Sequence, residues 1–145
     1  MTRIILIRHG QTAWNAEERI RGQVEVPLDP VGISQAQATA ARVAQEWQPV
    51  AVYCSPLQRA VQTARYIAAD AGVTAQVVPE LNDMNFGSWQ GLSYREVRQN
   101  WPEMARQWME EPDTVTFPDG ESLARVRERS MKAIHRITDQ HPGDQ

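Results

Sequence analysis

Apolar residues occur in this chain as short continuous runs and as runs at helical spacing. The continuous runs are Ile4–Ile7, Val50–Cys54 and the shorter Ala75–Val78, and all three contain β-branched residues. Such runs are typical of strands that a parallel sheet buries on both faces. The pattern therefore predicts three buried parallel strands.

Two helices are predicted between these strands. Asp29-Pro30 and Ser55-Pro56 each place a capping residue before a proline, which is how many helices begin. Gly72 is expected to end the second helix. The positions expected to face the core recur every three or four residues: Ile33, Ala36, Ala40, Val43 and Trp47, then Leu57, Val61, Ala64 and Ala68.

The rest of the chain is less regular. Residues 11–30 and 80–91 are polar and are expected to form loops, and long irregular stretches are usually functional. Residues 94–110 predict a helix interrupted at Pro102, and residues 122–138 predict a last helix. Strands alternating with helices predict an α/β fold with three layers, in which helices flank a central, mostly parallel sheet. The length of 145 residues predicts one domain, residues 1–145.

Composition narrows the class of protein. Apolar residues make up 41% and charged residues 23% of the chain, as in ordinary soluble globular proteins. The net charge of −3 gives no support to nucleic-acid binding. The single cysteine, Cys54, excludes an internal disulfide and is expected to be a buried thiol. Ile4–Ile7 is too short for a signal peptide or a membrane span, so we expect no membrane partner and a cytoplasmic protein.

Polar side chains follow each predicted strand. Arg8-His9-Gly10 comes after the first strand, Arg59 follows the second, and Asp83 follows the third. Ligands of open α/β sheets bind at the carboxyl ends of the strands. The sequence therefore predicts that a histidine, two arginines and a carboxylate meet at one edge of the sheet.

His9 is the candidate nucleophile. A lone histidine near a strand end is more often a hydrogen-bonding residue than a catalyst. Here Arg8 would disfavour the imidazolium and keep a ring nitrogen free, and Gly10 would let the backbone approach a ligand.

Arg59 and Asp83 are the candidate partners of His9. Arg59 could be a solvated surface arginine, but its place in the first turn of a helix favours anion binding. Arg8 and Arg59 could together hold the oxygens of a phosphoryl group. Asp83 could be the general acid, with Glu80 as its rival.

The sequence offers no cofactor motif. The three histidines are far apart and no cysteine pair accompanies them, so no metal site is predicted. Neither glycine-rich nucleotide-binding motif is present.

Four ordered segments resemble the histidine phosphatase superfamily, the phosphoglycerate-mutase-like proteins. Together they span nearly the whole chain: residues 6–15 with Arg8-His9-Gly10, residues 21–32 with Arg21-Gly22, residues 55–64 with Ser55-Pro56 and Arg59, and residues 81–91 with Leu81-Asn82-Asp83. The segment around Leu81 is most similar to the phosphatase branch, which includes α-ribazole-phosphate and broad-specificity phosphatases.

The resemblance implies a fold, a reaction and roles for residues. It implies the phosphoglycerate-mutase-like fold and a metal-independent enzyme in which His9 accepts the phosphoryl group of a small phosphorylated metabolite. Arg8 and Arg59 would bind the phosphate, and Asp83 would protonate the leaving oxygen. The positions that would line the substrate pocket are Gly10, Asn15, Arg21 and Gly22.

Two positions depart from the family pattern. Gln90 replaces a frequent glutamate, and we expect little effect. The family's second pocket histidine, in a Ser-His-Gly setting on a later strand, has no counterpart, since neither His135 nor His141 has that context. We therefore expect a C-terminally truncated domain whose exposed sheet edge could form a homodimer.

Three functions follow as hypotheses. The leading one is hydrolysis of small phosphomonoesters through a phosphohistidine on His9. The alternatives are a cofactor-dependent phosphoglycerate mutase and, since the second histidine is missing, a phosphate-binding module with little turnover.

Overall fold

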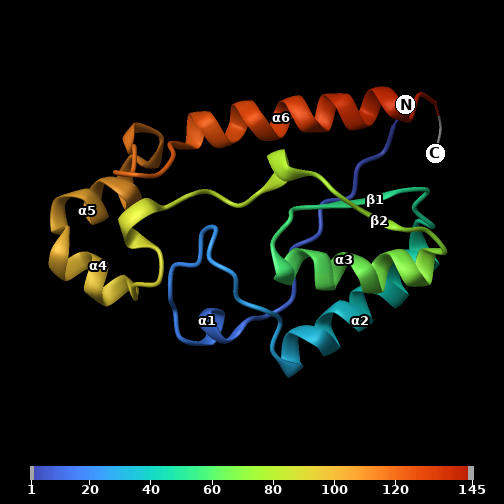
Figure 1. Ribbon diagram of the computed structural model, residues 1–145, viewed down its shortest axis with the longest axis horizontal. Helices are drawn as coiled ribbons and strands as arrows, with labels where there is room; N and C mark the ends of the chain where they lie inside the picture. Colours follow the sequence, from blue (N-terminus) through green and yellow to red (C-terminus); the bar gives the residue numbers. More distant parts are fainter. Residues whose placement is uncertain (1, 144–145) are drawn as a thin grey trace.

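The computed structural model describes residues 2–143 and contains a small parallel sheet flanked by helices (Figure 1). Helix α6 lies on one side of strands β1 and β2, and helices α2 and α3 lie on the other, which gives the expected layers. The elements in chain order are α1 (Ala13–Ala16), α2 (Pro30–Glu46), β1 (Val52–Cys54), α3 (Gln58–Ala71), β2 (Ala75–Val77), the 3₁₀ turns η1 (Pro79–Leu81) and η2 (Gly87–Trp89), α4 (Tyr94–Asn100), α5 (Pro102–Glu110), the 3₁₀ turn η3 (Pro112–Thr114) and α6 (Leu123–Gln140).

Most helix boundaries follow from local sequence. Asp29 caps α2, since its Oδ1 accepts a hydrogen bond from the Gly32 N–H at 2.7 Å. Pro102 begins α5, as the interruption predicted. Gly72 ends α3 in the left-handed conformation at φ 72°. The predicted cap at Ser55 was wrong, because α3 begins only at Gln58, after Leu57.

The sheet contains one strand pair among residues 2–143. β1 and β2 run parallel, with Val52 opposite Ala75 and Cys54 opposite Val77. Cys54 is buried and free, as predicted, and burial raises the pKa of its thiol. These are the second and third predicted strands, and each is shorter than its apolar run.

The prediction of a first strand at Ile4–Ile7 was wrong. Residues 2–11 form no strand, and Leu6 is 85% exposed while Ile4 is 49% exposed. The segment and residues 49–55 instead line the same cavity of about 520 Å³. A β-branched run has the composition of a buried strand, but it becomes one only when neighbouring strands satisfy its backbone.

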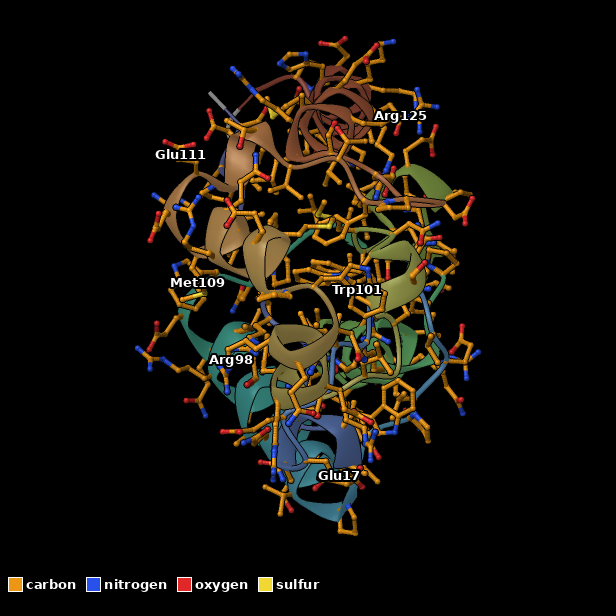
Figure 2. All side chains as sticks on the ribbon, turned by 90° about the vertical axis from the view of Figure 1, so that its left-hand side faces the viewer. Glu17, Arg98, Trp101, Met109, Glu111 and Arg125 are labelled. Carbon is orange, nitrogen blue, oxygen red and sulfur yellow. The ribbon has the colours of Figure 1, made fainter. Side chains whose placement is uncertain are left out.

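Two apolar clusters hold the described chain together. One lies between α2 and α3 around Ala40, Val43 and Ile67. The predicted core residue Trp47 lies outside it and is 38% exposed. The larger cluster surrounds buried Trp89 and Phe117, whose rings meet edge to face at a centroid distance of 4.8 Å. Figure 2 looks onto α4 and α5, where Trp101 joins the two helices and packs against this cluster.

Candidate active site

His9 lies half-buried at the end of the N-terminal segment. Its Nδ1 lies 2.7 Å from the carbonyl oxygen of Gly10. Because a carbonyl only accepts hydrogen bonds, Nδ1 carries the proton and donates it, so Nε2 keeps its lone pair. Burial lowers the pKa of His9, and the positive charges of three arginines, Arg59, Arg21 and Arg8, lower it further. The neutral ring with a free Nε2 is the form in which histidine is a nucleophile.

Gly10 fixes the backbone on which His9 is carried. Its N–H donates to Thr63 Oγ1 at 3.1 Å, and Thr63 in turn donates to the Arg59 carbonyl at 2.8 Å. A Cβ at Gly10 would collide with the backbone of Gly32 in the first turn of α2. Gly10 is therefore required for close contact with α2. Its predicted close approach to a ligand stays a prediction.

Arg59 is a buried cation rather than a surface residue. It lies in the first turn of α3 and is 1% exposed. Its Nη1 donates to the Val24 carbonyl at 2.8 Å, and its Nη2 donates to the Gly22 carbonyl at 2.6 Å. These bonds hold the loop of residues 21–24 against α3 and fix the guanidinium in place.

Of the two candidates for the general acid, Asp83 forms an ion pair with Arg59 and Glu80 does not. Oδ2 of Asp83 accepts from Arg59 Nη2 at 3.1 Å, and its side chain is 41% exposed. Glu80 pairs instead with Arg136 of α6 at 2.9 Å, and this hydrogen bond lowers the pKa of Glu80. The two predicted alternatives therefore have different partners.

Arg21 and Gly22 adjoin the same cluster. Burial lowers the pKa of Arg21, and the charge of Arg59 adds to that effect while Asp83 opposes it. The Nε of Arg21 is buried and has no hydrogen-bond partner among residues 2–143. Gly22 has a φ of 53°, and its carbonyl is one of the two that Arg59 holds. Arg21 therefore brings a buried donor without a protein partner to the position next to Gly22.

Arg8 and Asn15 are the remaining residues that the sequence predicted for the site. Arg8 is exposed, and with His9 it lines a small cavity of about 250 Å³ above Ala36 and Thr63. Asn15 Oδ1 accepts from the N–H and the hydroxyl of Thr12, each at 2.9 Å, and so it caps α1. The phosphate-binding role of Asn15 stays a prediction.

Three further residues touch this site, and none of them was predicted from the sequence: Thr63, Gln23 and Arg129. Thr63 links Gly10 to Arg59, as described above. Gln23 Nε2 donates to the Asp83 carbonyl at 3.0 Å, and Arg129 Nη2 donates to the same carbonyl at 2.9 Å. The spacing of four residues between Arg59 and Thr63 is a signal present in the sequence, because such positions share one face of a helix.

Within residues 2–143, no group of three or more His, Cys, Asp or Glu side chains is placed to hold a metal ion. In that same part of the chain, no helix has the length and apolar character needed to cross a membrane.

The family model described as "Histidine phosphatase superfamily (branch 1)" matches residues 4–145. Among curated proteins, the metal-independent phosphoserine phosphatase of Arabidopsis thaliana is 40% identical over 146 residues, which cover 99% of this chain and 61% of that protein. This chain thus spans about three fifths of the length of that relative.

Solved structures agree with the sequence match. Bacillus stearothermophilus YhfR superposes with a TM-score of 0.88 and 29% identity, over 94% of this chain and 67% of that chain. The α-ribazole phosphatase from Shigella flexneri superposes with a TM-score of 0.81 and 30% identity, over 92% of this chain and 66% of that chain. The predicted resemblance and fold class are confirmed.

Proposed function

Because this chain belongs to the histidine phosphatase superfamily, we propose that it acts on small phosphomonoesters through a phosphohistidine formed on His9. The observation that carries the proposal is the state of His9. Its Nδ1–H is engaged with Gly10, and its pKa is lowered by burial and by three neighbouring arginines. A neutral nucleophile next to three cations suits attack on an anionic phosphorus centre.

The first step would transfer the phosphoryl group to His9. A bond forms between Nε2 and phosphorus, and the bond between phosphorus and the ester oxygen breaks with its electron pair going to that oxygen. We assign Arg8, Arg59 and Arg21 to the phosphoryl oxygens, since all three lower the pKa of His9. Two backbone carbonyls hold the Arg59 guanidinium in place, so it needs little reorganisation to act.

Asp83 is the residue we assign as general acid, rather than Glu80. Asp83 contacts Arg59 directly, whereas Glu80 pairs with Arg136 on α6. A phosphomonoester monoanion brings a proton into the site, and Asp83 would pass that proton to the leaving oxygen. Water would then attack the phosphohistidine, which releases inorganic phosphate and restores Nε2.

The substrate class is proposed from the family and the cationic pocket. A small phosphorylated metabolite fits a site whose charged groups gather around one histidine. Phosphoserine phosphatase and α-ribazole phosphatase are the names of similar proteins, and both describe phosphomonoester hydrolysis. We also propose a cytoplasmic location and a homodimer.

Direct assays separate this function from its alternatives. We expect the chain to release phosphate from p-nitrophenyl phosphate and not to interconvert phosphoglycerates when 2,3-bisphosphoglycerate is present. Interconversion of phosphoglycerates would instead support the alternative function, a cofactor-dependent phosphoglycerate mutase.

The phosphate-binding module is favoured by one observation. Of the other two histidines, His135 lies on α6 and His141 at its end, where Nε2 of His141 lies 2.8 Å from the Tyr53 hydroxyl. Within residues 2–143, neither side chain bonds to a residue of the site. Calorimetric binding of phosphate, without hydrolysis and without label on His9, would support this alternative.

A further inference from the structure

Arg129 holds residues 80–85, the acid loop, which carries Asp83. It lies in the second turn of α6 and is only partly exposed, at 20% of its side chain. Its Nη1 donates to the carbonyls of Glu80 at 2.8 Å and Asn82 at 2.7 Å, and its Nη2 donates to the carbonyl of Asp83 at 2.9 Å. One guanidinium therefore binds three carbonyls within four consecutive residues.

Glu121 completes this contact from the other side. Its two oxygens accept from Nε and Nη2 of Arg129 at 2.8 and 3.0 Å, so the pair is bidentate. Glu121 Oε2 also accepts from the Asn85 N–H at 2.9 Å, and its own N–H donates to the Asn85 carbonyl. The hydrogen bond from Arg129 lowers the pKa of Glu121, so the pair stays charged.

Together these bonds clamp residues 80–85 at both ends. The carboxyl of Asp83 lies in the middle of this stretch, and its Oδ1 accepts from the Met84 N–H at 2.7 Å. The side chain of Asp83 is thus tied to a backbone that Arg129 and Glu121 fix. The only other side chain that bonds to the Asp83 carbonyl within residues 2–143 is Gln23.

We propose that Arg129, braced by Glu121, is a positioning residue that aims the Asp83 carboxyl at the leaving oxygen of the substrate. The proposal rests on the proposed function, since it assigns Arg129 a task in that reaction. Arg129 itself binds the acid loop and not the substrate. The task requires arginine, because only a planar group with five donors can reach three carbonyls and a carboxylate at once.

Arg136 provides a matched control on the same helix. It also binds this loop, but only through the side chain of Glu80, in an exposed ion pair of 2.9 Å. Exposed ion pairs of this kind contribute little to the stability of the fold. Loss of Arg136 should therefore leave the backbone of Asp83 in place.

The first test compares leaving groups. A nitrophenolate leaves readily without a proton, whereas the serine alkoxide of O-phosphoserine needs one. In Arg129→Met we expect kcat for O-phosphoserine to fall about 10- to 100-fold with KM nearly unchanged, and kcat for p-nitrophenyl phosphate to fall much less. Arg129→Lys should not restore the alkyl rate, and Arg136→Met should leave both rates unchanged.

Equal losses on both substrates, or full rescue by lysine, would overturn the proposal. No labelling of His9 in the wild-type chain would overturn the proposed function instead.

A second measurement does not depend on turnover. Amide hydrogen exchange at Met84 and Asn85 should accelerate in Arg129→Met and stay at the wild-type rate in Arg136→Met. Unchanged exchange in Arg129→Met would show that Arg129 does not hold the acid loop, whatever the activity.

Discussion

Nη2 of Arg59 lies 3.1 Å from Oδ2 of Asp83, which joins a buried cation to a half-exposed carboxylate. The two residues come from the start of α3 and from the loop after η1, 24 positions apart. The same guanidinium binds the carbonyls of Gly22 and Val24. Arg59 thus links helix α3 to the loop of residues 21–24 and to the loop that carries Asp83.

Replacing Arg59 should therefore cost stability as well as activity. Arg59→Met leaves two carbonyls and a carboxylate without their donor, and a lost hydrogen bond to a charged group costs about 1.5–3 kcal/mol. We expect the free energy of unfolding to fall by at least about 2 kcal/mol in urea titrations. Arg42→Met, which removes an exposed pair with Glu46 on α2, is the control and should change stability by less than about 0.5 kcal/mol. Equal stability of both variants would contradict the structural role of Arg59.

His9→Ala should abolish phosphoenzyme formation. Nε2 of His9 is the nitrogen that the Gly10 contact leaves free, and burial together with three arginine charges lowers the pKa of this ring. Rapid quenching after incubation with ³²P-labelled substrate should trap acid-labile phosphate in the wild-type chain only. His135→Ala, on the exposed side of α6, should label normally. Acid-labile label in His9→Ala would rule out His9 as the acceptor.

The pKa of His9 should lie below its ordinary value of 6.5. Burial is the main cause and the arginine charges add to it, so NMR titration of the ring protons should give a midpoint below 6.5. Between the lowered pKa and 6.5 the unfolded chain binds more protons than the folded chain. Above pH 6.5 the protonation of His9 therefore does not lower the free energy of unfolding. That free energy falls as the pH drops from 6.5 through the lowered pKa of His9.

Removing one positive charge tests the cause of this shift. Arg8→Gln should raise the midpoint of His9, because Arg8 is one of the three arginines that lower it. Arg98→Gln on α4, labelled in Figure 2, is the matched control and should leave the midpoint unchanged. A midpoint above 6.5 in the wild-type chain would contradict the neutral nucleophile.

Chelators should not affect phosphoryl transfer. The proposed step places arginine side chains where other phosphatases use metal ions, and guanidinium groups offset phosphoryl charge directly. Labelling of His9 should proceed at the same rate after dialysis against EDTA. A strict requirement for added Mg²⁺ would contradict the assignment of Arg8, Arg59 and Arg21.

Local patterns predicted the helices and the residues around His9 better than they predicted the sheet. Capping residues and prolines act within a few residues, so the beginnings of α2 and α5 could be predicted from sequence. A strand depends on distant partners, and Ile4–Ile7 has the composition of a buried strand without being one here. Arg129 was missed for a related reason: it lies off the apolar stripe of α6, and its three carbonyl partners are 46 to 49 residues away.

The exposed first segment should make the chain associate. Ile4 and Leu6 are 49% and 85% exposed, and residues 4–7 form no strand pairing within the part of the chain that the structure describes. An exposed apolar segment whose backbone is unpaired favours pairing with another chain. We expect sedimentation velocity to show a dimer, and Leu6→Lys to weaken it at least about tenfold, because burying a leucine contributes about 1.5–3 kcal/mol. Met109→Lys on α5 is the matched control, since Met109 is 80% exposed but lies far along the chain from residues 4–7. A monodisperse monomer of the wild-type chain would contradict the dimer, and equal weakening by both substitutions would place the interface elsewhere.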